Sequence, residues 1–288
     1  MDLNGHAVGI ILKELVRRAM VIARRQIMSF EVNGKMGYGG EMDDFFTTAD
    51  TLAQESYVKS LQECFPDIGI VGEENFLVVQ GSNKSDAYFT VDPIDGTKAY
   101  IRRQSHGVGS MVALVVNGII VSAYVGDVNS REIFGYRPES SSAWRITDLE
   151  MYEKLNPDPP EVDLGELYIL LRERESKYSQ VSQKTINAFK SISIDGGSIG
   201  TWAARLWMGE VGALLLAPFW ETPWDSSPVI GISQKLGYRF FEPNEKKSWW
   251  EEYIPVISKE KYRRKHDMLI IHKNQVRQLA KVLPVAQF

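Results

Sequence analysis

The hexapeptide Asp92–Thr97 (DPIDGT) places two carboxylates three positions apart, directly after the short apolar run 88–91. Proline fixes φ at Pro93 and favours an extended backbone at Asp92, whereas Gly96 tolerates close approaches that a side chain would forbid. Asp92 and Asp95 can therefore converge. Two neighbouring carboxylates repel unless they share a proton or bind cations, and all-oxygen ligands favour Mg²⁺, Mn²⁺ or Ca²⁺ over zinc. The segment predicts a metal-binding turn, with an ordinary capped turn as the alternative.

Three further acidic elements lie at the ends of predicted strands or the starts of predicted helices. The strand-like run 68–71 leads into Glu73 and Glu74, Asp50 lies beside a helix start, and Asp225 follows Pro223 where a helical pattern begins. Each element alone fits a cap or a solvated turn. Four such elements in this order form a specific signal for one shared metal site.

The sequence resembles the inositol monophosphatase family, within the wider group of Mg²⁺-dependent, lithium-sensitive phosphatases that includes fructose-1,6-bisphosphatase and the bisphosphate nucleotidases. The matching motifs are Asp-x-x-Thr-x-x-Asp at 44–50, Gly-Glu-Glu at 72–74, the hexapeptide 92–97, Ser-Ile-Gly-Thr at 198–201 and Trp-Asp at 224–225. They span most of the chain. The resemblance implies a layered α/β (α+β) fold, an α-β-α-β-α sandwich.

The resemblance also implies roles for individual residues. A first metal ion would be held by Glu73, Asp92 and the carbonyl of Ile94, a second by Asp92, Asp95 and Asp225, and a weaker third ion would lie near Glu73. The catalytic residues, which would orient the attacking water, are Asp50, Thr97 and Glu73. Phosphate and substrate contacts would come from Gly96, Thr97, Gly200, Thr201 and Trp202. The ions would be Mg²⁺, with Mn²⁺ as a substitute and Ca²⁺ or Li⁺ as inhibitors, and the protein would be a homodimer.

This chemistry suits a phosphate monoester. Such a substrate carries close to two negative charges at neutral pH, so cations must neutralise its oxygens before water can attack. No nucleophilic side chain is then required, and the sequence has a single cysteine and no Walker-type loop. We therefore predict a Mg²⁺-dependent phosphomonoesterase acting on a small polyol, sugar or nucleoside phosphate.

Other specificities and one other class of function stay open. Lys98 is reminiscent of the 3′(2′),5′-bisphosphate nucleotidase and histidinol-phosphatase branches. Pro218 replaces a glutamate that usually contacts a substrate hydroxyl, so the substrate is not determined. Trp202 replaces a small residue and would reshape the pocket, with an orientation into the core as the alternative. A non-catalytic homologue that binds a phosphorylated ligand, or an RNA-associated regulator, is the competing class.

Composition restricts the partners of the protein. The chain has 288 residues, 44% of them hydrophobic, and a net charge of −4, which suits a substantial core and gives no global attraction for nucleic acid. We interpret the basic groups at 17–25 and 259–265 as solvated surfaces, with an RNA or acidic-partner surface as the alternative.

Charged residues interrupt the N-terminal apolar segment and Asn117-Gly118 interrupts the run 111–125, so we expect no membrane segment. Cys64 is predicted to be a buried free thiol, and a single cysteine suits a cytoplasmic protein. The expected ligand is a small phosphorylated metabolite.

The elements that must position these residues follow from periodicity. Apolar residues at helical spacing predict a long first helix through Val8–Ala23, a second helix is expected at 49–64, and an antiparallel meander at Gly107–Tyr136. The glycine-rich stretch Asn33–Gly40, with its single Lys35, is predicted to be a mobile loop that could close over the metals. A proline-rich linker at 156–160 is predicted to divide the chain into an N-terminal α+β half (1–155) with most metal ligands and a C-terminal α/β half (161–288) that completes the site and the substrate pocket. One compact unit is the alternative.

Overall fold

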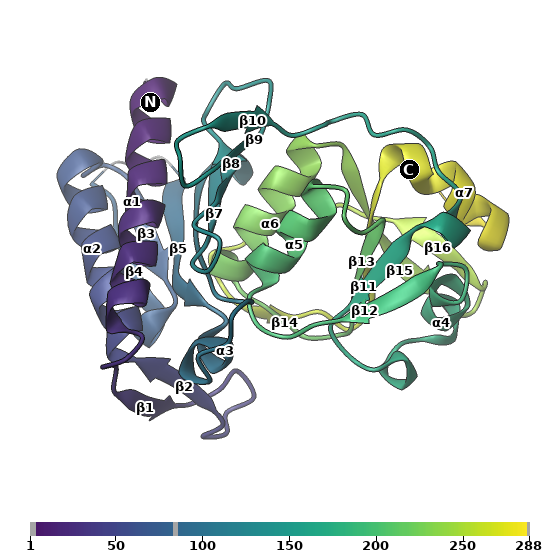
Figure 1. The fold of residues 1–288 in the computed structure, drawn as a ribbon, viewed down its shortest axis with the longest axis horizontal. Coiled ribbons are helices and arrows are strands. Elements are labelled where there is room, and N and C mark those ends of the chain that lie inside the picture. The colour runs from purple at the N-terminus through teal and green to yellow at the C-terminus, as the bar shows by residue number, and fades with distance from the viewer. Residues whose placement is uncertain (1–3, 83–85, 287–288) are drawn as a thin grey trace.

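Five alternating layers of helix and sheet build residues 4–82 and 86–286, which are the part of the chain that the computed structural model describes (Figure 1). Helices α1 (Gly5–Gln26) and α2 (Thr48–Cys64) cover the outer face of an eight-stranded sheet. Helices α5 (Ile199–Trp207) and α6 (Pro223–Lys235) lie between it and a seven-stranded sheet, whose far face is covered by α4 (Gln180–Ile186) and α7 (Val276–Val282). The predicted α-β-α-β-α sandwich is confirmed.

The first sheet carries the hexapeptide on a central strand. Its strand order is β10-β9-β8-β7-β6-β5-β3-β4, and only the β3–β5 pair is parallel. The strands are β3 (Gly69–Gly72), β4 (Leu77–Val79), β5 (Ala87–Asp95), β6 (Gly109–Val116), β7 (Ile119–Asp127), β8 (Ile133–Tyr136), β9 (Trp144–Ile146) and β10 (Tyr152–Lys154). Strands β6 to β8 form the predicted antiparallel meander, and Asn117 and Gly118 make its first turn with φ values of 51° and 74°.

The second sheet is built from the C-terminal part of the chain. Its order is β12-β11-β13-β18-β15-β16-β19, and parallel and antiparallel pairs are mixed. The strands are β11 (Tyr168–Leu171), β12 (Ser191–Ile194), β13 (Ala213–Leu216), β15 (Tyr238–Asn244), β16 (Trp249–Glu252), β18 (Met268–His272) and β19 (Val285–Ala286). Two small ladders, β1 (Val32–Lys35) with β2 (Asp44–Thr47) and β14 (Trp220–Glu221) with β17 (Tyr262–Arg263), and the short helix α3 (Thr97–Ile101) lie outside the two large sheets.

Local sequence explains where the two outer helices begin. The Asn4 side chain accepts hydrogen bonds from the N–H groups of His6 and Ala7, and α1 then buries its apolar stripe as predicted. Helix α2 begins with a capping box, in which Thr47 caps the helix and the Asp50 side chain accepts from the Thr47 N–H. The capping box fixes the Asp50 carboxylate at the start of α2.

Two expectations are corrected by the fold. Cys64 is the last residue of α2 and is exposed, because the apolar face of that helix ends at Leu61. The predicted mobile loop 33–40 is a strand in its first part, since Asn33, Gly34 and Lys35 pair with β2 in an antiparallel hairpin. In the described part of the chain, no helix is both long and apolar enough to cross a membrane.

Candidate metal centre

A β-bulge brings Asp92 and Asp95 to the same side of strand β5. In a regular strand, residues three positions apart point to opposite faces. Here Asp92 pairs with Met111 and Asp95 pairs with Gly109, so three steps along β5 match two along β6. The one extra residue follows from Pro93, which has no N–H to donate to the ladder. The proline of the hexapeptide thus permits the convergence that its two aspartates require.

Asp225 completes a cluster of three carboxylates. One ligand oxygen each from Asp92, Asp95 and Asp225 lie within 4.8 Å of one another. Asp225 stands in the first turn of α6, where the Thr222 hydroxyl donates to its Oδ2 at 2.7 Å. Asp92 Oδ1 is buried and has no hydrogen-bond partner among the described residues. A buried carboxylate oxygen without a donor, beside two more carboxylates, fits a divalent cation with oxygen ligands.

Ser198 and Gly200 hold Asp95 in place. The Ser198 hydroxyl donates to Asp95 Oδ2 at 2.5 Å, and the Gly200 N–H donates to the same oxygen at 2.8 Å. Ser198 also caps α5. Residues 196–200 read Gly-Gly-Ser-Ile-Gly, which matches the pattern of a serine-hydrolase nucleophile. The serine hydroxyl is instead committed to Asp95, so its role here is structural.

Like charges and burial raise the pKa values in this cluster. Burial, followed by Glu73, Asp95 and Asp225, raises the pKa of Asp92 well above its ordinary value. Burial and the neighbouring Asp95 raise the pKa of Asp225 to about 7. Burial also raises the pKa of Asp95, but the Ser198 and Gly200 hydrogen bonds oppose that shift. Without a cation, the cluster therefore favours bound protons.

The metal-free protein is expected to be more stable at about pH 5.5 than at about pH 8. Asp225 and Glu74 have ordinary pKa values of 3.8 and 4.5, and folding raises them to about 7 and about 8. Stabilisation by these protonated groups is complete below the unfolded-state pKa values and is lost as the pH rises through the folded-state values. The melting temperature of EDTA-treated protein should fall by a few °C over this range, at roughly 2–4 °C per kcal/mol. Mg²⁺ should raise the melting temperature more at pH 8 than at pH 5.5. A melting temperature of the metal-free protein that rises from pH 5.5 to 8 would contradict this prediction.

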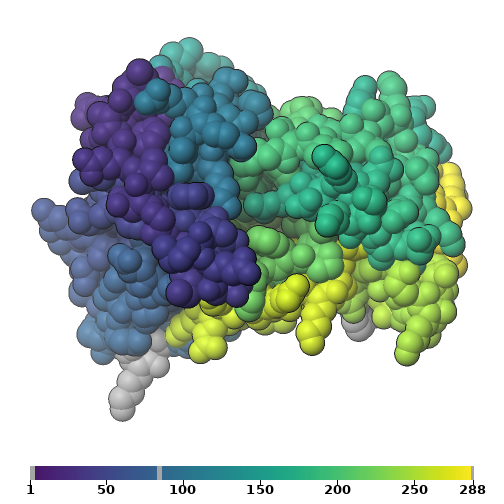
Figure 2. All heavy atoms as spheres, turned by 90° about the horizontal axis from the view of Figure 1, so that it is seen from below, coloured from purple at the N-terminus to yellow at the C-terminus, as the bar shows by residue number. Residues whose placement is uncertain are grey.

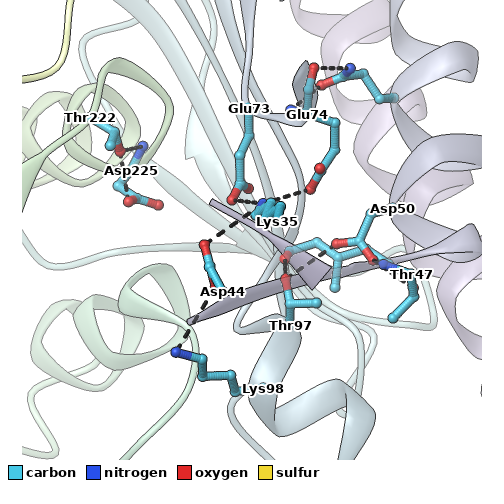
Figure 3. Close-up of polar contacts among 12 residues, drawn as sticks. Lys35, Asp44, Thr47, Asp50, Glu73, Glu74, Thr97, Lys98, Thr222 and Asp225 are labelled. Carbon is cyan, nitrogen blue, oxygen red and sulfur yellow. Dashed lines mark hydrogen bonds and ion pairs between the residues drawn. The ribbon is translucent and has the colours of Figure 1, made fainter. Parts of the chain in front are cut away.

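Glu73, the fourth predicted ligand, is paired with Lys35. Figure 3 shows the ammonium group of Lys35 reaching from β1 to the Glu73 and Glu74 carboxylates, at 2.8 Å and 3.1 Å. Burial opposes the charge of Lys35, but the two glutamates outweigh it and raise its pKa. Burial, the neighbouring Glu73 charge and other carboxylates raise the pKa of Glu74 to about 8, although Lys35 opposes this. A metal ion at Glu73 would compete with Lys35 for that carboxylate.

Thr97 and Asp50 meet beside the cluster. The Thr97 hydroxyl lies 3.2 Å from Asp50 Oδ1 (Figure 3). It also lies 3.1 Å from the carbonyl oxygen of Ile94, and it can donate to either oxygen. Asp50 Oδ2 accepts from the N–H and the hydroxyl of Thr47 at 2.8 Å and 2.5 Å. Burial raises the pKa of Asp50 to about 6, although the Thr47 hydrogen bonds oppose this. The pair predicted from the sequence is therefore in contact.

These groups line one cavity of about 470 Å³. Figure 2 shows the surface hollowed between the purple-to-blue N-terminal residues and the green residues of the second half. The predicted residues on its wall are Glu73, Asp92, Ile94, Asp95, Gly96, Thr97 and Asp225. Asp50 lies behind Thr97 and is fully buried.

Three residues predicted to contact substrate lie elsewhere. Trp202 is 2% exposed and packs in the core between the two sheets, so the expectation that it contacts substrate is corrected. Helix α5 lies between the two sheets, and Trp202 is buried there in the same core cluster as Ala203, Leu206 and Trp207. Gly200 and Thr201 do not line the cavity, and Gly200 instead supports Asp95.

Four basic residues on or beside the cavity were not assigned a role in the site from the sequence. Lys35 was assigned only to a loop and Arg263 only to the solvated basic group 259–265, whereas Arg102 and Arg172 were given no role. Arg172 directly follows the apolar strand β11, just as Glu73 follows β3. Polar residues at strand ends were a usable signal for Arg172. Nothing in the local pattern around Arg263 distinguishes it from its basic neighbours.

The chain belongs to the inositol monophosphatase family, whose family model matches residues 6–278. The Nus factor SuhB of Pseudomonas aeruginosa is 30% identical over 198 residues, which are 67% of this chain and 70% of that protein. The match to the Nus factor SuhB of Xylella fastidiosa is 37% identical over 91 residues and spans only 32% of this chain and 31% of that protein. Among solved structures, an IMPase/NADP phosphatase complexed with NADP and Ca²⁺ has a TM-score of 0.73 at 17% identity and covers 98% of this chain and 97% of that one. This last likeness supports the fold.

Proposed function

We propose that the protein is a Mg²⁺-dependent phosphomonoesterase that hydrolyses a small phosphorylated metabolite. One observation carries the proposal: Asp92, Asp95 and Asp225 converge within 4.8 Å in a cavity that Thr97 also lines. Three carboxylates at such short separation, two of them buried and the third half-buried, are costly without a cation. The cavity also has room for a small metabolite beside them.

The carboxylates would hold the metal ions. Asp92, Asp95 and Asp225 would bind one Mg²⁺, while Glu73, Asp92 and the Ile94 carbonyl would bind another, and a third ion near Glu73 fits the same scheme. When bound, the ions would neutralise the phosphoryl oxygens and lower the pKa of a coordinated water. Lys35 supplies a positive charge to Glu73 and Glu74 when no ion is present.

Thr97 and Asp50 would orient the attacking water and take its proton. A hydroxyl has one proton and two lone pairs, so Thr97 can donate to Asp50 while it accepts a hydrogen bond from water. With a pKa of about 6, Asp50 is ionised above neutral pH and can receive a proton through Thr97. The Asp50 carboxylate is fixed by the capping box of α2, so little reorganisation is needed.

Phosphate release from a panel of substrates tests the proposal. Inositol monophosphate, fructose 1,6-bisphosphate, histidinol phosphate and adenosine 3′,5′-bisphosphate are each incubated with Mg²⁺, with EDTA, and with Mg²⁺ plus Li⁺ or Ca²⁺. We expect Mg²⁺-dependent release from at least one of them, and inhibition by Li⁺ and Ca²⁺. A further incubation with Mn²⁺ in place of Mg²⁺ should give partial activity. No release from any substrate, together with tight binding of one, would favour the non-catalytic alternative.

A further inference from the structure

Three arginines line the cavity together with the metal-binding carboxylates, namely Arg102, Arg172 and Arg263. Arg102 donates to the Gln104 side-chain oxygen at 3.2 Å, so its guanidinium already has a partner. Arg172 and Arg263 are both exposed, and both come from the C-terminal half of the chain. Neither lies within 4.0 Å of a carboxylate oxygen, and neither guanidinium makes a hydrogen bond, to any residue in the described ranges 4–82 and 86–286. Each guanidinium has five N–H donors and no acceptor, so both can bind an anion.

Aromatic rings fix the position of Arg172. Its guanidinium carbon is 5.7 Å from the ring centroid of Trp202 and 5.6 Å from that of Phe219. Cation–π contacts of this kind hold a guanidinium by its face and leave its N–H edge free. Arg172 is therefore held in place before a ligand binds.

The β14–β17 ladder presents Arg263 to the cavity. Arg263 is the register partner of Trp220, and cross-strand partners project from the same face of a ladder. Both residues line the cavity. The next residue, Arg264, points the other way and is buried, where it binds Glu221 at 2.8 Å and the Ala217 carbonyl at 2.9 Å. Arg264 thus anchors the ladder, whereas Arg263 keeps its donors free.

The charges on the cavity wall indicate which charged groups the substrate carries. Metal ions at the carboxylates would carry the charge of the phosphate that is cleaved, so the two arginines are not needed for it. When a ligand displaces water, an arginine without an acceptor would lose hydrogen bonds and gain nothing. A guanidinium matches a phosphate group with paired N–H donors. Phe219 and Trp220, which also line the cavity, add an apolar surface beside the two arginines.

We propose that Arg172 and Arg263 bind a second phosphate group, so that the preferred substrate is a bisphosphate of a small metabolite. This inference rests on the proposed phosphatase function. It assigns the cleaved phosphate to the carboxylates and their metal ions, and the retained phosphate to the arginines. The result would be selectivity for bisphosphates over the corresponding monophosphates, expressed mainly in KM.

Matched substrate pairs test the inference. Phosphate release is measured with Mg²⁺ for adenosine 3′,5′-bisphosphate against adenosine 3′-monophosphate, and for fructose 1,6-bisphosphate against fructose 1-phosphate. The wild type should prefer the bisphosphate of at least one pair by about 10-fold or more in kcat/KM. Arg172→Gln and Arg263→Gln should each lower bisphosphate kcat/KM by about 10- to 100-fold and change monophosphate kcat/KM by less than about threefold. The pair that shows the effect identifies the nucleoside or the sugar as the carrier.

Control variants separate recognition from folding. Arg277→Gln removes the same charge from an exposed position on α7, behind the second sheet, and should leave both rates unchanged. Arg172→Lys keeps the charge but not the paired donors, and should lose less than Arg172→Gln. Equal losses for both members of a pair, or an unchanged preference in the arginine variants, would overturn the inference and leave the phosphatase function standing.

A binding measurement covers the case in which no substrate is hydrolysed. That result would remove the proposed function, and calorimetric titration with adenosine 3′,5′-bisphosphate and adenosine 3′-monophosphate in Mg²⁺ then decides the inference. Tighter binding of the bisphosphate that Arg172→Gln and Arg263→Gln abolish would support a second anion site. Equal binding of the two nucleotides, or no binding of either, would overturn it.

Discussion

Asp95→Asn is expected to lower phosphate release by about 10³-fold or more, which corresponds to about 4 kcal/mol of transition-state stabilisation. The substitution removes one negative charge and one strong oxygen ligand from the three-carboxylate cluster. The fold should survive, because an asparagine carbonyl can still accept from the Ser198 hydroxyl and the Gly200 N–H. Initial rates in saturating Mg²⁺, on the best substrate of the panel, measure the effect.

Asp148→Asn is a matched control for this prediction. Asp148 is an exposed aspartate whose carboxylate pairs with Arg131 at 2.9 Å, outside the cavity. Removal of its charge should leave turnover unchanged. Circular dichroism and a melting curve establish that each variant is folded. Near-wild-type turnover of folded Asp95→Asn in saturating Mg²⁺ would contradict a metal site built on Asp95.

Gly96→Ala is expected to destabilise the protein by about 3 kcal/mol or more and to abolish activity. Gly96 has a φ of +89°, and a Cβ there would lie 2.3 Å from the Gly107 carbonyl oxygen and 2.7 Å from the Ser198 nitrogen. Both are backbone atoms, so neither can rotate away. Relief would require movement of the segment that carries Asp95 and Thr97. Denaturant unfolding gives the change in the free energy of unfolding.

Gly118→Ala isolates the cost of the backbone conformation. Gly118 also has a positive φ, of +74°, but a Cβ there would meet nothing within 4 Å. This variant should lose only about 1 kcal/mol, which is the cost of a left-handed conformation for alanine. If Gly96→Ala proved no more destabilising than Gly118→Ala, the close packing of residues 96, 107 and 198 would not matter to stability.

The family resemblance carried by the motifs was sufficient to predict the layered fold, and the periodicity of apolar residues predicted the first helix. The convergence of Asp92, Asp95 and Asp225 was also predicted, although Asp225 lies far from the hexapeptide in sequence. The bulge that makes it possible depends on the pairing of β5 with β6, which local sequence does not specify. The sequence therefore predicts which residues form the site better than it predicts the backbone geometry that brings them together.

The errors concern which side of an element faces the core. Trp202 was assigned to the substrate pocket but is buried on the short helix α5, and Cys64 was expected to be buried but lies exposed at the end of α2. The orientation of a short helix depends on its neighbours and its cap rather than on its own pattern. Lys35, Arg172 and Arg263 illustrate the same limit, because their relation to the carboxylates follows only from tertiary contacts.

Phosphate release as a function of free Mg²⁺ tests the central claim most directly. Wild-type protein and Asp95→Asn are stripped with EDTA and titrated with Mg²⁺, while bound metal and released phosphate are measured on the same samples. We expect no phosphate release from metal-free wild type and release that rises with metal occupancy. Asp95→Asn should show neither bound metal nor phosphate release at the same Mg²⁺ concentrations. Undiminished release from the metal-free wild type would contradict this expectation.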